Sequence, residues 1–144
     1  MTKVLIVEDE RLAGEMLAKY VDSVPDRYEL FDVIRSAADA EIVCYRTNID
    51  LILMDVCTAK KASGLDAAEK IKKHFPQIKI IVVTSAPEFR FIEKARAVGV
   101  ESFWYKDSGE VELLSVMDRT MAGESIYPDK TPAVEIGDAS SYDF

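Results

Sequence analysis

The sequence predicts an α/β fold in which a parallel sheet is covered by helices on both faces. Short apolar runs of strand length alternate with helical patterns five times along the chain. Strands that alternate with helices require right-handed crossovers, which place the helices on both sides of a parallel sheet. Two of the runs, at 51–54 and 78–83, are wholly or almost wholly apolar, as expected for strands buried on both faces.

The first two strand and helix repeats fill the N-terminal third of the chain. A short apolar run at 3–7 forms the first strand, and it leads into the acidic cluster Glu8-Asp9-Glu10. Apolar residues then recur at helical spacing over 11–22. Residues 28–34 alternate as a second strand, and a second helix is expected to end near Thr47.

The third repeat contains the strand around which the rest of the chain is organised. The stretch Asp50–Val56 is an apolar run that carries one carboxylate, Asp55, to its far end. In an open α/β sheet, the ligand site lies just beyond the carboxyl ends of such strands. A loop over 57–63 follows, and the next helix runs over 64–75 until Pro76 stops it.

The last two repeats contain the strands 78–83 and 102–105. The helix after the first of these strands ends at Gly99, and the final helix ends near Met121. Three capping-box pairs predict where helices begin: Ser36 with Asp39, Ser85 with Glu88, and Asp107 with Glu110.

Composition excludes several classes of protein. The 18 basic and 26 acidic residues give a net charge of -8, which opposes binding to a phosphate backbone. No apolar run is long enough to cross a bilayer and no signal peptide is present, so we expect a cytoplasmic protein with no membrane contact. The 2 cysteines, Cys44 and Cys57, have neither zinc nor disulfide spacing and are expected to be reduced.

Residues that suit phosphoryl chemistry follow four of the five predicted strands. Because parallel strands end at one edge, this edge gathers Glu8, Asp9, Asp55, Thr84 and Lys106. Three neighbouring carboxylates repel one another unless a cation lies among them, and oxygen ligands of this kind suit Mg²⁺. A lysine then stabilises the remaining negative charge, a hydroxyl serves as a donor, and Asp55 is the expected nucleophile.

Each of these residues also has an ordinary structural explanation when it is taken alone. An Asp after a strand is often a turn or helix-capping residue, as Asp55 would then be. Acidic residues such as Glu8 and Asp9 commonly complement a helix dipole. Thr84 could simply end a strand, and Lys106 could be solvated. Their coincidence at neighbouring strand ends is what favours a functional site.

Four segments in order resemble the receiver domains of two-component response regulators. The resemblance covers residues 3 to about 122. The segments are Val4–Glu10 for the opening acidic motif, Leu51–Asp55 for the phosphoacceptor strand, Ile81–Ser85 for the switch threonine, and Gly99–Asp107 for the lysine motif. Each motif alone is weak, whereas all of them at family spacing are highly specific.

The resemblance implies a doubly wound, five-stranded sheet in the order 2-1-3-4-5, as in flavodoxin-like and CheY-like folds. It also implies that a partner histidine kinase phosphorylates Asp55, with Mg²⁺ as cofactor. Asp9 would bind the metal directly, Glu8 mostly through water, and Cys57 through its backbone carbonyl.

The resemblance further implies how the signal leaves the site. Thr84 would move toward the phosphoryl group on activation, and Phe103 occupies the switch-aromatic position. The face formed by the fourth helix, fifth strand and fifth helix would change, and phosphorylation would promote a homodimer through helices four and five or helices one and five. Such a domain is a signalling module that catalyses only its own phosphorylation and dephosphorylation.

The lysine motif and the segment Ser125–Pro128 look most like receivers of helix-turn-helix transcription regulators of the NarL/LuxR type. We therefore expect residues 1–123 to be the receiver domain and 124–144 to be a linker or tail. DNA would be bound only through a C-terminal domain that this sequence does not contain. A fragment cut in the linker is favoured over a stand-alone receiver that acts by protein contact, because the tail has linker composition.

The chain departs from the family in the loop after Asp55. Here the segment 56–64 is one residue longer than usual and lacks the family's proline, so greater mobility of the loop is expected. Lys60 and Lys61 could attract a phosphate or the kinase, although two solvated loop lysines are the simpler interpretation.

Two other functions are weaker alternatives. A Mg²⁺-dependent phosphohydrolase that uses Asp55 as its nucleophile would need a second acid two residues later, where this chain has Cys57. A nucleotide-binding module would need a glycine-rich turn after the first strand, where Glu8 and Asp9 would repel a pyrophosphate.

Overall fold

The computed structural model describes residues 1–86 and 88–128. In this part of the chain, five parallel strands form one sheet in the order β2-β1-β3-β4-β5, which confirms the predicted fold and strand order. Pro87 and most of the predicted tail, 129–144, lie outside the described residues. The strands are β1 (Thr2–Val7), β2 (Tyr28–Ile34), β3 (Leu51–Asp55), β4 (Lys79–Thr84) and β5 (Ser102–Tyr105).

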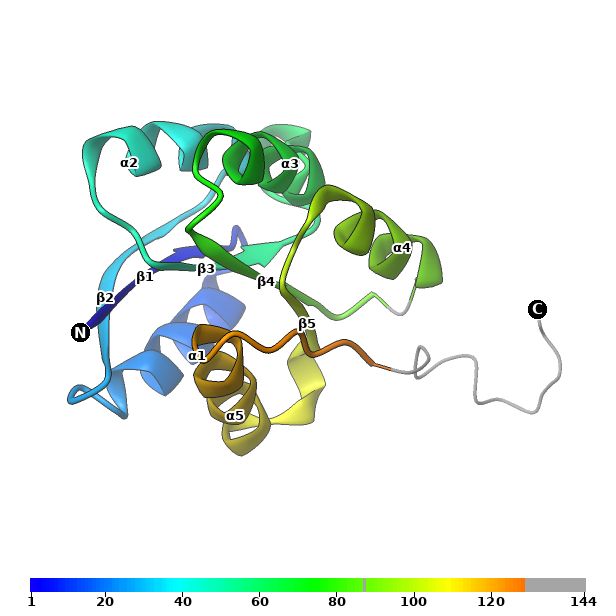
Figure 1. Ribbon diagram of the computed structural model, residues 1–144. Helices are drawn as coiled ribbons and strands as arrows, with labels where there is room; N and C mark the ends of the chain where they lie inside the picture. Colours follow the sequence, from blue (N-terminus) through cyan, green and yellow to red (C-terminus); the bar gives the residue numbers. More distant parts are fainter. Residues whose placement is uncertain (87, 129–144) are drawn as a thin grey trace, which may run out of the picture.

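Helices cover both faces of the sheet. Figure 1 shows α2, α3 and α4 on one face and α1 and α5 on the other. None of the helices in the described ranges is long and apolar enough to cross a membrane. The helices are α1 (Arg11–Asp22), α2 (Ala40–Arg46), α3 (Gly64–His74), α4 (Phe89–Val98) and α5 (Glu110–Met121), with short 3₁₀ turns at Ala37–Asp39, Ala59–Lys61 and Lys106–Ser108.

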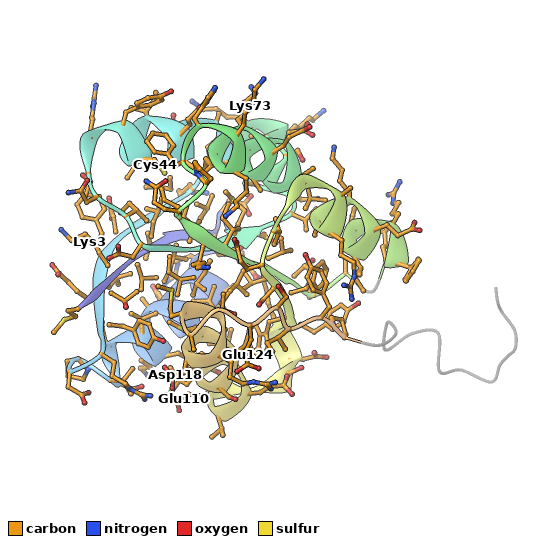
Figure 2. The ribbon with its side chains drawn as sticks, viewed as in Figure 1. Lys3, Cys44, Lys73, Glu110, Asp118 and Glu124 are labelled. Atoms are coloured by element: carbon orange, nitrogen blue, oxygen red, sulfur yellow. The ribbon has the colours of Figure 1, made fainter. Side chains whose placement is uncertain are left out.

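The sheet separates two hydrophobic cores, and side chains fill the space on both of its sides (Figure 2). In β3, Ile52 and Met54 belong to the core under α2, α3 and α4, whereas Leu51 and Leu53 belong to the core over α1 and α5. All five residues of β3 are buried. The strand therefore places Asp55 at the edge of the sheet with apolar packing on both faces.

Strand β5 alternates in the same way. Trp104 packs into the core with α1 and α5, and Phe103 and Tyr105 pack into the other core. The rings of Phe103 and Tyr105 meet edge to face, with centroids 5.5 Å apart. Although β5 is at the end of the sheet, its two faces are thus both covered.

The helix starts differ in part from the capping predictions. Ser36 Oγ accepts a hydrogen bond from the Ala38 N–H at 3.2 Å, but this bond opens a 3₁₀ turn, and α2 begins only at Ala40. The remaining two predicted pairs are wrong. The N-cap of α4 is Glu88, so the predicted capping residue Ser85 lies three residues too early. The N-cap of α5 is Gly109 and not Asp107. Neither N-cap residue makes a side-chain capping bond.

Helix α3 begins directly against the end of β3. Ser63 Oγ caps this helix by accepting a hydrogen bond from the Asp66 N–H at 3.1 Å. The Gly64 N–H donates to the Val56 carbonyl at 2.7 Å. A Cβ atom on Gly64 would lie 1.7 Å from the backbone oxygen of Asp55. Only glycine allows the helix and the strand to approach this closely.

We predict that Gly64→Ala destabilises the fold by about 1–3 kcal/mol, because the added methyl group overlaps the Asp55 carbonyl and forces the backbone apart. Chemical denaturation followed by circular dichroism measures the change. Gly14→Ala in α1 is the matched control, since its Cβ would meet nothing nearer than Val33 Cγ1 at 3.4 Å and alanine favours a helix. Equal stability of the two variants would contradict the close approach at Gly64.

Candidate functional site

The residues predicted to form a site all lie at the carboxyl edge of the sheet. Glu8 and Asp9 follow β1, Asp55 ends β3, Thr84 ends β4, and Lys106 follows β5. Because the strands are parallel, these ends share one edge, where open α/β sheets bind ligands. Four of the five, Glu8, Asp9, Asp55 and Lys106, lie close together.

Three carboxylates form the centre of this edge. Glu8, Asp9 and Asp55 each offer one oxygen, and the three oxygens lie within 4.8 Å of one another. Glu8 is 2% exposed and Asp55 is 7% exposed, whereas Asp9 is half-buried. Water therefore screens the repulsion between Glu8 and Asp55 only weakly.

Lys106 is the cation beside this cluster. Its Nζ lies 2.6 Å from Glu8 Oε1 and 3.5 Å from Asp55 Oδ2. Burial acts to lower the pKa of Lys106, but its contacts with Glu8 and Asp55 outweigh burial and raise the pKa. The side chain is therefore a charged ammonium, and one positive charge faces three carboxyl groups.

Asp55 holds a proton more strongly than an ordinary aspartate. Burial raises the pKa of Asp55 to about 7, and the Glu8 carboxylate adds to this rise. Lys106 acts in the opposite direction, as does the hydrogen bond that the Val56 N–H donates to Asp55 Oδ1 at 2.8 Å. Lys106 therefore does not offset the combined effect of burial and of the Glu8 carboxylate on the pKa of Asp55.

Glu8 has one oxygen with spare acceptor capacity. Its Oε2 accepts a hydrogen bond from the Glu10 N–H at 3.2 Å. Its Oε1 is buried, and apart from the ion pair with Lys106 Nζ at 2.6 Å it has no hydrogen-bond partner in the described part of the chain. A buried carboxylate oxygen in this condition is suited to a metal ion or to a metal-bound water.

Thr84 and Phe103 are placed differently from the carboxylates. Thr84 is buried at the end of β4, and its Oγ1 accepts a hydrogen bond from the Ala86 N–H at 3.1 Å. The hydroxyl is thus held in the turn that follows β4. Phe103 is buried in the core beside α4 and does not belong to the cluster at the sheet edge.

Hydrogen bonds of Thr58 hold the loop after Asp55 in place, and the sequence patterns did not identify this residue. Thr58 is buried, and its Oγ1 accepts from the Ala37 N–H and donates to the Ala62 carbonyl, both at 2.8 Å. The Ala59 N–H also donates to the Arg35 carbonyl at 3.0 Å. A threonine in a polar loop gives no sequence signal for this role, because its partner Ala37 lies on another segment.

Cys57 lies on the exposed side of the same loop and faces Ser63 in an isolated antiparallel bridge. The two bonds of this bridge join Gly64 N–H to Val56 O and Thr58 N–H to Ala62 O. Neither bond uses the carbonyl of Cys57, which leaves that oxygen available to another ligand.

A cavity of about 810 Å³ opens beside the cluster, between this loop and α4. Val56, Leu65 and Phe91 supply apolar side chains to its wall, and Asp9 lines it next to the site. Two lysines of the loop, Lys60 and Lys61, have left-handed backbones with φ of 62° and 57°. Four basic residues also line the cavity: Lys60, Lys61, Arg90 and Lys94.

Comparisons with known sequences agree on one family. The sequence model of the response regulator receiver domain matches residues 4–118. The response regulator protein VraR of Staphylococcus epidermidis is 30% identical over 125 residues, as is VraR of Staphylococcus aureus. The match covers 87% of this chain and 59% of each relative, so the chain spans little more than half the length of the relatives it matches.

Solved structures have the same fold. The RcsB response regulator of Salmonella typhimurium is similar with a TM-score of 0.81 at 16% identity, over 90% of this chain and 66% of that one. A CheY-like receiver domain protein of Methanospirillum hungatei gives a TM-score of 0.77 at 19% identity, over 85% and 94% of the two chains. With the family match over residues 4–118, the chain belongs to the receiver domains of two-component response regulators.

Proposed function

We propose that Asp55 is the phosphoacceptor of this receiver domain and that a sensor histidine kinase is the donor. The observation that carries the proposal is the buried Asp55 carboxylate, with Lys106 Nζ 3.5 Å from its Oδ2 and two further carboxylates beside it. A carboxylate can accept a phosphoryl group where the developing charge is stabilised. An oxygen of Asp55 bonds to phosphorus while the donor's bond between phosphorus and the imidazole nitrogen breaks, and the imidazole keeps that electron pair.

Mg²⁺ is the proposed cofactor. The donor set fits it, because the ligands are all oxygens, one Glu8 oxygen has no hydrogen-bond partner, and Lys106 leaves negative charge uncompensated. Asp9 and Asp55 would bind the ion directly, Glu8 mostly through water, and Cys57 through its backbone carbonyl. When bound, the ion would supply the positive charge that lets the cluster accept a phosphoryl group.

Each remaining residue has a proposed task. The Val56 N–H holds Asp55 Oδ1 by its hydrogen bond of 2.8 Å and so fixes the orientation of the carboxylate. The Lys106 ammonium stabilises charge on the transferred group. Thr84 would leave the Ala86 N–H and donate its hydroxyl to a phosphoryl oxygen, and this movement would be transmitted to Phe103.

The cavity beside Asp55 is the proposed approach for the phosphodonor. Lys60 and Lys61 are exposed and line this cavity, where their positive charge would attract a phosphorylated group. Arg90 and Lys94 contribute less, because Arg90 pairs with Glu88 at 2.6 Å and Lys94 with Asp66 at 2.7 Å.

The proposed output is control of transcription in the cytoplasm. Residues 1–123 would act as the receiver domain and 124–144 as the linker to a DNA-binding domain, with no catalysis on free substrates. A stand-alone receiver is the alternative. The support for DNA as the final partner is that the structural relative RcsB has been solved as dimers bound to DNA.

We predict that acetyl phosphate with Mg²⁺ adds one phosphoryl group to the chain and that Asp55→Asn abolishes the addition, because the nucleophilic oxygen is gone. Intact-mass spectrometry measures the product. Asp50→Asn is the matched control, since Asp50 lies just before the opposite end of β3, where it accepts a hydrogen bond from the Lys3 N–H. Acid-stable labelling that survives Asp55→Ala would contradict the proposal, and many turnovers of a phosphate ester would indicate a phosphohydrolase.

A second prediction concerns pH in the absence of metal. The pKa of Asp55 rises from 3.8 to about 7 on folding, so the folded state keeps a proton that the unfolded state loses. Stability from this group is therefore lost as pH rises from about 4 to about 7, by at most about 4 kcal/mol. Asp55→Asn should become progressively more stable than the wild type over this window.

Urea denaturation in EDTA at several pH values measures that difference. Because Mg²⁺ competes with the proton for the Asp55 carboxylate, added Mg²⁺ should stabilise the wild type more at pH 8 than at pH 5. Asp50→Asn again serves as the control and should follow the wild type. A stability difference between Asp55→Asn and the wild type that is independent of pH would show that Asp55 is not strained by its neighbours.

A third prediction concerns self-association. Exposed apolar side chains stand at the beginning of both helices of the proposed output face: Phe89 on α4 is 53% exposed and Val111 on α5 is 84% exposed. The phosphorylated chain should sediment as a dimer through α4 and α5, or through α1 and α5, and Asp55→Asn should stay monomeric. Unchanged sedimentation after stoichiometric phosphorylation would argue against a dimerising switch.

A further inference from the structure

The chain does not leave the domain at the end of α5 but turns back onto the sheet. Gly123, with φ of 104°, ends the helix in the left-handed conformation. The Gly123 N–H donates to the Thr120 carbonyl and the Glu124 N–H to the Arg119 carbonyl, each at 3.0 Å, which is the Schellman pattern. Residues 124–128, here called the return segment, then run back past β5, beginning at Glu124 (Figures 1 and 2).

The return segment covers the free edge of β5. Because β5 is the last strand of the sheet, half of its backbone groups lack a strand partner. The Phe103 N–H donates to the Ile126 carbonyl at 2.9 Å. In return, the Ile126 N–H donates to Ser102 Oγ at 3.0 Å, and this hydroxyl shares a buried hydrogen bond of 2.6 Å with Thr120 Oγ1.

Tyr127 anchors the return segment between α4 and β5. Its hydroxyl donates to the Val100 carbonyl at 2.6 Å. The guanidinium carbon of Arg96, on α4, lies 4.0 Å from the centre of the Tyr127 ring, a cation–π contact. Burial raises the pKa of Tyr127, so the hydroxyl keeps its proton and remains a donor.

The ring of Tyr127 also meets Phe103, with centroids 6.1 Å apart. Phe103 thus contacts both Tyr127 and Tyr105, the latter at 5.5 Å. Tyr105 is in turn paired with Thr84 in the register of β4 and β5. A continuous series of contacts therefore joins the threonine at the candidate site to the return segment.

The return segment is attached through few hydrogen bonds. It lacks the regular ladder of a strand, since its only backbone-to-backbone bond with β5 in the described residues is the one at Phe103. Its further bonds to this region run from the Ile126 N–H to Ser102 Oγ and from the Tyr127 hydroxyl to the Val100 carbonyl, and both residues are partly buried. Segments held by few hydrogen bonds are those that detach locally.

We infer that the return segment is a latch on α4 and β5, which is closed when the site is empty and is released when the site is loaded. The inference rests on the proposed function, because it takes Thr84 and Phe103 to move on loading. Displacement of Phe103 toward Thr84 separates its ring from Tyr127. Release would uncover the edge of β5 and separate Ile126 and Tyr127 from their partners at Phe103 and Val100.

Reciprocity of coupling provides the test. If loading opens the latch, then a variant whose latch is already open must bind the phosphoryl mimic more tightly by the same factor. Tyr127→Ala in the full chain should therefore bind beryllofluoride with Mg²⁺ about threefold to tenfold more tightly than the wild type. Thermal shift at increasing fluoride measures the affinity. Tyr45→Ala is the control, since Tyr45 is a 65% exposed tyrosine on α2 that packs edge-on to Phe75.

Two further measurements keep the test decisive. Tyr127→Phe keeps the ring but loses the bond to the Val100 carbonyl, and it should change affinity in the same direction by less. Hydrogen exchange at the Phe103 and Ile126 amides should accelerate when the wild type is loaded, and it should not respond to the same additions in Asp55→Asn.

The outcomes separate the latch from the proposed function. Tighter binding by Tyr127→Ala, with faster exchange on loading, supports the latch. If the wild type binds the mimic but Tyr127→Ala binds equally or more weakly, or if the two amides exchange no faster on loading, the latch is wrong and the phosphoacceptor role stands. If the wild type does not bind the mimic at all, the proposed function itself fails.

Discussion

The crowding of negative charge at the carboxyl edge of the sheet is the constraint on which the rest of the site depends. Glu8 and Asp55 are nearly fully buried, and Asp9 completes a cluster of oxygens within 4.8 Å. Burial raises the pKa of Asp55 to about 7, the Glu8 carboxylate adds to this rise, and Lys106 compensates the charge only in part. A site in this condition gains stability from a bound cation and has a carboxylate that is oriented in advance. The repulsion among these carboxylates exists only in the folded state, where it favours binding of a cation beside Asp55, the proposed nucleophile.

The scaffold holds this unfavourable arrangement by packing on both sides of β3. Two apolar cores enclose the strand, so that Asp55 cannot move away from its neighbours without disturbing them. The approach of Gly64 to the Asp55 backbone and the hydrogen bonds of Thr58 fix the loop that follows. Greater mobility of this loop stays a prediction. Within the loop, Lys60 and Lys61 have left-handed backbones and line the cavity.

The proposed output face depends on β5, which is an edge strand whose two faces are both covered. Trp104 contributes to one core and Phe103 to the other, so a shift of this strand is transmitted to both helix layers. The register of β4 with β5 pairs Tyr105 with Thr84, and the ring of Phe103 contacts the rings of both Tyr105 and Tyr127. A few aromatic side chains therefore connect the candidate site with the return segment.

The sequence by itself determined the order of strands and helices, the parallel sheet and the set of site residues. These follow from local periodicity and from the rule that parallel strands end at one edge, so Glu8, Asp9, Asp55 and Lys106 could be grouped before any coordinates were known. It misplaced the start of α4 and the capping residues of both α4 and α5, because residues with capping-box spacing, as at Ser85 and Asp107, recur by chance in turns. Only the tertiary structure decided how strongly the carboxylates are buried, that Thr58 anchors the loop, and that Tyr127 returns to Phe103. Those properties arise between residues distant in sequence, and local patterns carry no information about such contacts.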